Sequence, residues 1–251
     1  LHVSDFHLAP WQKRKQRFIA ELANLNPDLV VNTGDNLGHR DAIGPLVESL
    51  TPLMRYPGVF AHGSNDYEAP SLRNPLSYLL SPSKPQHGHP LDTERMTKAF
   101  ESGGWLNLNN RGGELTVSGL RIGFIGLDDA HDGKDDVSSI PAQVRSQTAI
   151  DLRIAVTHAP YLRFIELFTE ADASVIFAGH THGGQVCLPG NRALVTNCDL
   201  PRKNAKGLSS WSVAGKTMIL NVTAGLGHSI YAPVRFACRP EVRLLTLLPK
   251  S

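Results

Sequence analysis

The chain has 251 residues, a length that suits one α/β domain of generous size. Its 41% hydrophobic and 19% charged residues are ordinary for a globular protein, and a formal net charge of +2 gives no reason to expect nucleic acid as a partner. The sequence contains no signal peptide and no apolar run near the roughly 18 residues of a membrane helix. Because it starts at Leu1, inside an expected strand, we expect residues upstream. An anchor or export signal among them would make an otherwise cytoplasmic protein membrane-associated.

The first 61 residues alternate between strand and helix patterns. Trp11, Phe18, Leu22 and Leu25 recur near helical spacing, with Lys and Arg on the opposite face. The expected elements are a strand end at 1–5, a helix within 9–28, a buried strand at 29–31, a helix at 43–53 and a strand at 58–61. This alternation predicts βαβ units and a largely parallel sheet.

Short strands dominate the second half. Residues 114–129 predict two strands joined at Ser118-Gly119, and residues 211–223 predict a hairpin that turns at Ala214-Gly215. Further strands are expected at 152–156, 174–178 and 241–249. So many short strands predict two packed sheets within a single domain over residues 1–251. The proline-rich stretch 70–92 interrupts this pattern as a long loop, which we expect to act as a lid.

Polar residues of a restricted kind follow the expected strands. They are Asp5 and His7, then Asp35 and Asn36, then Ser64, Asn65 and Asp66, then His158, and lastly His180 and His182. Sites in α/β sheets form at the carboxyl ends of strands, so these loops should converge. Carboxylates, imidazoles and an amide together suit Zn, Fe or Mn, and the three scattered cysteines argue against a disulfide scaffold or structural zinc.

Spacing strengthens the metal interpretation. Asp5 and His7, like His180 and His182, stand two apart and share a face in an extended segment. Asp35 ends an apolar strand with no cationic neighbour in sequence, which is costly unless cations pair with it. Each motif alone fits an ordinary turn or helix entry. Their ordered occurrence at strand ends is what makes chance implausible.

The combination resembles the calcineurin-like metallophosphoesterase superfamily, which carries D-x-H, G-D, G-N-H-D/E, a lone His and G-H-x-H in this order. The closing stretches "GHTHGGQV" and "GLGHSIYAPVRFACRPEVRLLTL" look most like a bacterial phosphodiesterase branch that includes YaeI and YkuE, and "GSND" looks like its actinobacterial variant. The resemblance implies a four-layer αββα sandwich with two mixed β-sheets. It also implies two divalent metal ions, Mn, Fe or Zn, and hydrolysis of phosphate esters by in-line attack of a metal-bridging hydroxide.

The resemblance also assigns roles. It implies that Asp5, His7 and His182 hold the first metal, that Asp35 bridges both, and that His158 and His180 hold the second together with an amide from the third motif. That motif reads Gly63-Ser64-Asn65-Asp66 here, so an ungapped alignment puts Ser64 at the amide position and Asn65 at the acid-histidine position.

Three interpretations of this departure remain open. The first shifts the turn by one residue, so that the Asn65 amide oxygen binds the second metal. The second uses Ser64 or a water as the ligand and lets Asn65 donate to the phosphate. The third is a weak second site in a sensor or pseudoenzyme. We favour the first, because all the other ligands are present and an amide carbonyl is a better ligand than a hydroxyl.

In each case the usual general acid is missing, because Asn cannot donate a proton in this role. Substrates whose leaving groups need little protonation would suit such a site, or another histidine substitutes. His131 and His228, in glycine-rich loops, are the leading candidates, with His39 and His62 behind them.

We therefore expect a phosphoesterase that acts on a phosphodiester or pyrophosphate bond of a small molecule or lipid. The branch allows association with a membrane surface. The alternatives are a metal-binding regulatory protein with weak turnover and a plain α/β binding domain. The sequence does not define the natural substrate or the oligomeric state.

Overall fold

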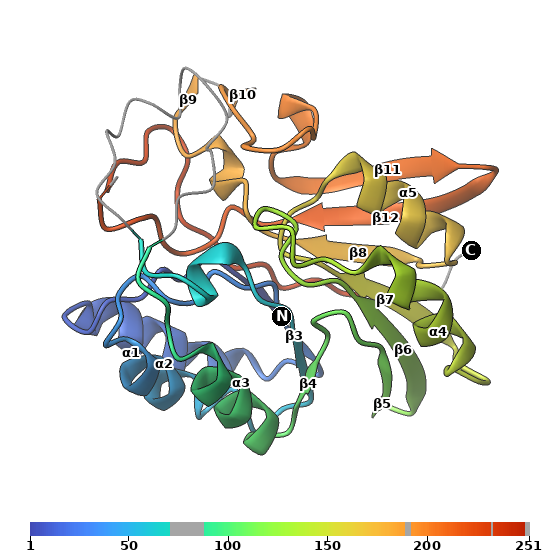
Figure 1. Cartoon of the computed structure of the whole chain (residues 1–251), viewed down its shortest axis with the longest axis horizontal. Coiled ribbons are helices and arrows are strands. Elements are labelled where there is room, and N and C mark those ends of the chain that lie inside the picture. The colour runs from blue at the N-terminus through green and yellow to red at the C-terminus, as the bar shows by residue number, and fades with distance from the viewer. Residues whose placement is uncertain (71–87, 189–191, 232, 249–251) are drawn as a thin grey trace.

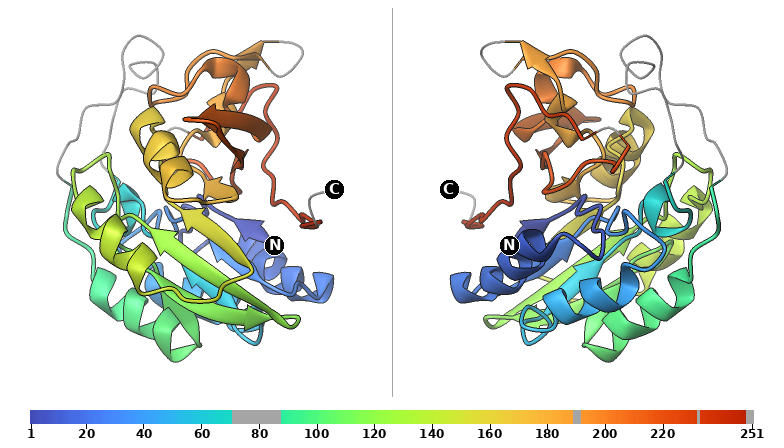
Figure 2. Two further views of the ribbon diagram at one scale, coloured as in Figure 1. Left: turned by 90° about the vertical axis from the view of Figure 1, so that its right-hand side faces the viewer. Right: turned by 90° about the vertical axis from the view of Figure 1, so that its left-hand side faces the viewer.

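The structure is a computed structural model that describes residues 1–70, 88–188, 192–231 and 233–248. It has four layers in which two β-sheets pack face to face and helices cover both outer faces (Figures 1 and 2). This arrangement confirms the expected αββα sandwich.

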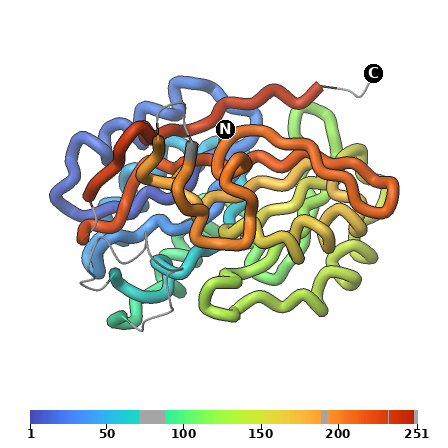
Figure 3. The backbone as a smooth tube through the Cα atoms, turned by 90° about the horizontal axis from the view of Figure 1, so that it is seen from above, coloured from blue at the N-terminus to red at the C-terminus, as the bar shows by residue number. Residues whose placement is uncertain are grey.

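The first sheet holds the N-terminal strands in the order β1-β2-β3-β4. These strands are all parallel, and their bounds are His2–Val3, Val30–Asn32, Gly58–Phe60 and Trp105–Asn107. An antiparallel bridge between His2 and Arg243 extends this sheet at its β1 edge, so the sheet is mixed. Figure 3 shows the closing segment, in red, returning toward the N-terminus to make this contact.

The second sheet has six strands in the order β11-β12-β8-β7-β6-β5. Its bounds are β5 Gly113–Val117, β6 Leu120–Gly126, β7 Leu152–Val156, β8 Val175–Ala178, β11 Gly207–Val213 and β12 Lys216–Val222. Its outer pairs, β5·β6 and β11·β12, are the two expected hairpins, and both are antiparallel. The remaining pairs are parallel. A short antiparallel pair, β9 Cys187–Leu188 and β10 Arg192–Ala193, lies outside both sheets.

The helices divide between the two outer faces. Those on the first sheet are α1 Lys13–Glu21, α2 Ile43–Leu50 and α3 Thr93–Ser102, and those on the second are α4 Ile140–Arg145 and α5 Leu162–Glu170 (Figure 1). Short 3-10 turns join them at Leu22–Leu25, Ser64–Asp66, Val137–Ser139, His182–Gly184 and Arg202–Asn204.

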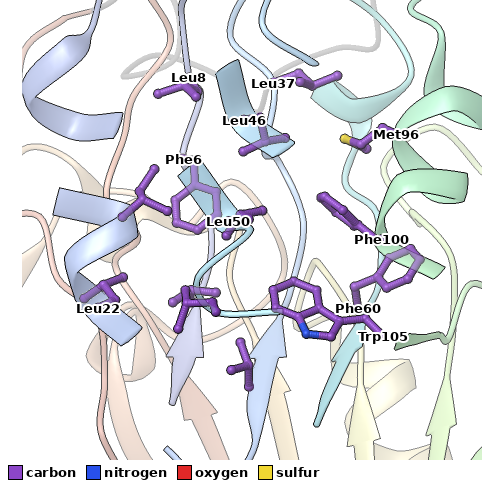
Figure 4. Packing of buried hydrophobic residues seen from close by; sticks show 14 of the residues in the cluster. Phe6, Leu8, Leu22, Leu37, Leu46, Leu50, Phe60, Met96, Phe100 and Trp105 are labelled. Carbon is purple, nitrogen blue, oxygen red and sulfur yellow. The ribbon is translucent and has the colours of Figure 1, made fainter. Parts of the chain in front are cut away.

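Three apolar cores correspond to the three interfaces between layers. Alternating residues of one strand enter different cores, because successive side chains of a strand point to opposite faces. In β3, Phe60 packs under the helices, whereas Val59 enters the core between the sheets. In β8, Phe177 enters that same middle core and Ile176 faces α5. Figure 4 shows the first core, where Phe60, Phe100 and Trp105 pack edge to face or tilted.

Three expectations about the chain need correction or stay open. The apolar face expected within 9–28 is shifted, because Ile19 and Leu22 are buried while Trp11 and Phe18 are 59% and 45% exposed. The strand expected at 241–249 is wrong, since only the bridge at Arg243 pairs there among the described residues and Leu248 is 80% exposed. The lid expected at 70–92 lies mostly outside the described residues. Among those that are described, no helix is long and apolar enough to cross a membrane.

Candidate metal centre

The predicted ligand side chains follow the ends of five strands and lie close together. Asp5 and His7 follow β1, Asp35 follows β2, the turn Ser64–Asp66 follows β3, His158 follows β7, and His180 and His182 follow β8. The strands of the first sheet and β7 and β8 of the second are parallel, so their carboxyl ends meet along one edge of the sandwich.

The backbone at this edge is unusual. Asp5, His7, Asp35, His180 and His182 all adopt left-handed φ values between 40° and 67°. Non-glycine residues in this region cost free energy and cluster at functional sites. The packing of the strand ends therefore holds these side chains at positions that relaxed turns would not give them.

One group of four side chains can hold a cation. Ligand atoms of Asp5, His7, Asp35 and His182 all lie within 4.8 Å of one another, and Asp5, His7 and Asp35 are buried. The Nε2 atoms of His7 and His182 face each other at 3.2 Å. His182 Nε2 lies 3.6 Å from Asp5 Oδ1. Two imidazole nitrogens aimed at each other beside two carboxylates match the donor set of a divalent metal.

A second group adjoins the first through Asp35. Its Oδ2 lies 3.4 Å from His7 Nε2 on one side and 3.4 Å from His158 Nε2 on the other. The Nδ1 of His158 donates to the carbonyl of Thr33 at 2.7 Å, which leaves its buried Nε2 for a ligand. The ring of His180 lies against that of His158, with centroids 5.2 Å apart. The geometry therefore places Asp35 between two sets of ligands.

Asn65 lies on the same carboxylate. Its backbone N–H donates to Asp35 Oδ1 at 2.9 Å and its side-chain amide donates to Oδ2 at 2.8 Å. Ser64 is half-buried and begins the 3-10 turn, with its carbonyl accepting from Tyr67 and Glu68. Asn65, and not Ser64, therefore contacts the Asp35 carboxylate. Whether its amide oxygen ligates a metal stays a prediction.

Two glycines allow the ligand loops to approach one another closely. A Cβ on Gly63 would collide with Asp35 Oδ1 and would stand 2.7 Å from His158 Cδ2. A Cβ on Gly179 would collide with Ser4 and Asp5. Steric crowding therefore explains why glycine stands at these two positions, just before the ligand loops.

Burial and mutual proximity set the protonation of the cluster. Burial lowers the pKa of His7 to about 4 and of His180 to about 3, so these rings are neutral and ready to act as ligands at pH 7. Burial raises the pKa of Asp5 to about 6. Burial also disfavours the charge on Asp35, but the adjacent His158 outweighs it and holds the pKa of Asp35 well below its usual range. Conversely, burial disfavours the charge on His158, and Asp35 raises its pKa well above the usual value.

Three further residues hold the ligands in place, and two of them, Ser4 and Arg235, were not singled out from the sequence. Ser4 donates to Asp5 Oδ2 at 2.6 Å. Asp66 accepts from the backbone of Asn36 and Leu37 and so ties the third loop to the second. Arg235 Nη2 lies 3.2 Å from His182 Nδ1 and donates to the Ala224 carbonyl at 2.7 Å. The sequence signal for Arg235 is a single cation inside the apolar stretch "APVRFAC".

The four histidines considered as a substitute acid fall into two pairs. The ring of His131 lies 5.4 Å from that of His180, and Tyr161 Oη stands 3.5 Å from its Nδ1. His228 is close enough to His7 to influence its pKa, and its own pKa is lowered by burial. In contrast, His62 is buried against Thr97 at 2.8 Å, and His39 pairs with Asp41 at the surface. Of these four, His131 makes a ring contact with a ligand, and His228 influences the pKa of another.

Comparison with known proteins agrees with this donor set. Residues 1–184 match the calcineurin-like phosphoesterase family. The chain belongs to this family. Its members are metallophosphoesterases, and the donors described above fit divalent metal ions, because orphaned imidazole nitrogens and buried carboxylates are both available.

Relatives and solved structures extend the comparison. The chain is 25% identical to the uncharacterized metallophosphoesterase YkuE of Bacillus subtilis (strain 168), over 98% of this chain and 78% of that protein. It is 27% identical to a transmembrane protein with a metallophosphoesterase domain from Danio rerio, and it spans only 52% of that protein. These matches support the YkuE-like branch.

The structural likeness confirms the fold. A 5'-nucleotidase precursor from Thermus thermophilus superposes with a TM-score of 0.52 at 14% identity, over 89% of this chain and 48% of that one. The TT1561 protein of the same organism gives 0.52 at 10% identity and covers 90% of each chain.

Proposed function

We propose that this protein hydrolyses a phosphodiester or pyrophosphate bond with two divalent cations. The observation that carries the proposal is the position of Asp35, whose Oδ2 lies 3.4 Å from imidazole nitrogens of two separate ligand groups. A carboxylate placed between two such groups suits a bridge between two cations. When bound, two such ions activate a water and neutralise the phosphoryl oxygens in an in-line displacement.

The residues divide between the two cations. Asp5, His7 and His182 would hold the first, His158 and His180 the second, and Asp35 both. The Asn65 amide, already on Asp35, would complete the second group. Ser4 and Arg235 would fix the orientation of Asp5 and His182, because they bond to Asp5 Oδ2 and His182 Nδ1 and leave Asp5 Oδ1 and His182 Nε2 beside each other.

The absence of a histidine in the third loop shapes the choice of bond. Asn65 can orient a phosphoryl oxygen by hydrogen bonding, but it cannot release a proton to a leaving group. A phosphate or nucleotide leaving group departs without much protonation. This chemistry favours a pyrophosphate or an activated diester over an alkyl monoester.

A basic loop offers a contact for such a substrate. Arg202 and Lys203 are exposed, and the carbonyl of Ala205 accepts a 2.6 Å hydrogen bond from Thr181, which stands between the two ligands of the GHTH motif. The loop is therefore fastened to the metal centre. We propose that its cations meet a phosphate or an acidic head group of a small molecule or lipid, with no role for nucleic acid.

The test is metal analysis followed by turnover. Protein reconstituted with Mn²⁺ should bind two ions per chain and hydrolyse bis-p-nitrophenyl phosphate. A panel of monoester, diester, nucleotide-sugar and lipid pyrophosphate then identifies the preferred bond. Two ions without turnover on any of these substrates would support the regulatory alternative, and binding of no ion would contradict both.

A further inference from the structure

The structure brings together two cysteines that are 51 positions apart in the sequence. Cys187 and Cys238 are 1% and 2% exposed. Both thiols donate to the same carbonyl oxygen, that of Gly183, at 3.2 and 3.5 Å. The two sulfurs are therefore neighbours within one small apolar cluster whose other members are Ala193, Ala205 and Ala224.

The backbone holds the two segments side by side. Val186 and Phe236 form a parallel bridge, and the Cys187 N–H donates to the Phe236 carbonyl at 2.9 Å. In this register Cys187 stands opposite the residue before Cys238, so the two cysteines are one position apart across the bridge. To form a disulfide, the two side chains would have to rotate past the Gly183 carbonyl oxygen that both sulfurs approach.

The pair also adjoins the metal centre. Cys238 Sγ lies 3.3 Å from the carbonyl of His182, a predicted ligand, and Arg235 reaches the Nδ1 of the same histidine. A bond between the sulfurs would thus fasten the ligand loop 182–187 to the closing segment that carries Arg235.

We propose that Cys187 and Cys238 are a disulfide site. With a small-molecule disulfide as oxidant, one thiolate attacks it and releases one thiol, which leaves a mixed disulfide on the protein. The second cysteine then attacks the protein sulfur of that mixed disulfide and releases the second thiol. One S–S bond forms, both cysteines lose their protons, and the two electrons reduce the oxidant to two thiols.

The third cysteine supplies the matched control. Cys198 is partly buried against the core under α5, outside the cluster that holds the pair. It hydrogen-bonds within its own loop, where its carbonyl accepts from Thr196 at 3.1 Å. Cys198→Ser should therefore leave the cross-link intact.

The experiment exposes the reduced protein to oxidised glutathione, blocks free thiols with iodoacetamide in denaturant, and maps the peptides by mass. We expect a Cys187–Cys238 cross-link with a loss of about 2 Da, in both the native chain and Cys198→Ser. Oxidation should raise Tm by on the order of 10 °C, because the bond closes a loop of about 50 residues. Cys187→Ala should abolish both effects.

Three results would overturn the proposal. They are a cross-link that contains Cys198, stable glutathione adducts on Cys187 or Cys238, and both thiols still alkylated after prolonged oxidation. The mass measurement on the native chain decides the matter even if Cys187→Ala fails to fold. None of these readouts depends on phosphoesterase activity.

Discussion

Asn65 donates twice to Asp35, from its backbone N–H to Oδ1 at 2.9 Å and from its side-chain amide to Oδ2 at 2.8 Å. The residue that departs from the family pattern is thus fixed on the carboxylate that we assign as the bridge. A half rotation of the amide about its last bond exchanges its NH2 for its oxygen. The same position can therefore serve a carboxylate or a cation.

The first prediction concerns this contact. Asn65→Ala should lower kcat/KM on bis-p-nitrophenyl phosphate by about 100-fold and reduce bound metal from two ions toward one, because the second group loses its amide. Ser64→Ala, a change at the neighbouring position, should cost less than about threefold. Metal content by mass spectrometry and steady-state rates check both. Two bound ions and full activity in Asn65→Ala would contradict the assignment of Asn65 as a ligand of the second ion.

The second prediction concerns the steric role of Gly63. Gly63→Ala should abolish binding of the second ion, because its Cβ would push against Asp35 and stand 2.7 Å from His158 Cδ2. Gly44→Ala is the control, since its Cβ would meet nothing within 4 Å on the exposed side of α2. That change should raise the free energy of unfolding by about 0.5–1 kcal/mol. Unchanged metal stoichiometry in Gly63→Ala would contradict the geometry.

The third prediction separates the two remaining acid candidates. His131→Asn should slow diesters with phenol leaving groups about tenfold more than those with p-nitrophenol, because the poorer leaving group needs the proton. His228→Asn should slow both equally, since burial lowers the pKa of His228 and leaves it mostly neutral at pH 7. Parallel rate measurements on the two substrates check this. A selective loss in His228→Asn would reverse the assignment.

The fourth prediction concerns pH and stability. Burial lowers the pKa of His62 to about 3, so the folded protein binds its proton less tightly than the unfolded chain, whose pKa is about 6.5. The unfolded state therefore gains protons first as the pH falls, and folding loses free energy below about pH 6.5. His62 alone should contribute a loss of about 2 kcal/mol between pH 7 and pH 5.

Urea denaturation of the metal-free protein at these two pH values measures this loss. His62→Gln should shrink the pH dependence by that amount, because the amide can still bond to Thr97 but does not titrate. Other buried histidines, such as His2, contribute to the same trend and remain in both proteins. An equal pH dependence in the two proteins would show that His62 does not carry the effect.

The sequence by itself indicated the two packed sheets and most of the candidate ligands. Short apolar runs such as those at 29–31 and 174–178 predict strands, and Ser118-Gly119 and Ala214-Gly215 mark both hairpin turns. Asp5, His7, Asp35, His158, His180 and His182 are readable because parallel strands end in polar residues of one chemical type. These features depend on residues close together in the sequence, so they can be recognised without knowledge of the fold.

Only the tertiary structure decided the contacts between distant segments. The sequence did not indicate that Asn65 lies on Asp35, that Arg235 reaches His182, or that Cys187 meets Cys238. It misplaced the strand expected at 241–249, where a single bridge to His2 replaces a regular ladder. Such contacts depend on the register and packing of elements far apart in the chain. The composition or periodicity of one segment therefore cannot predict them.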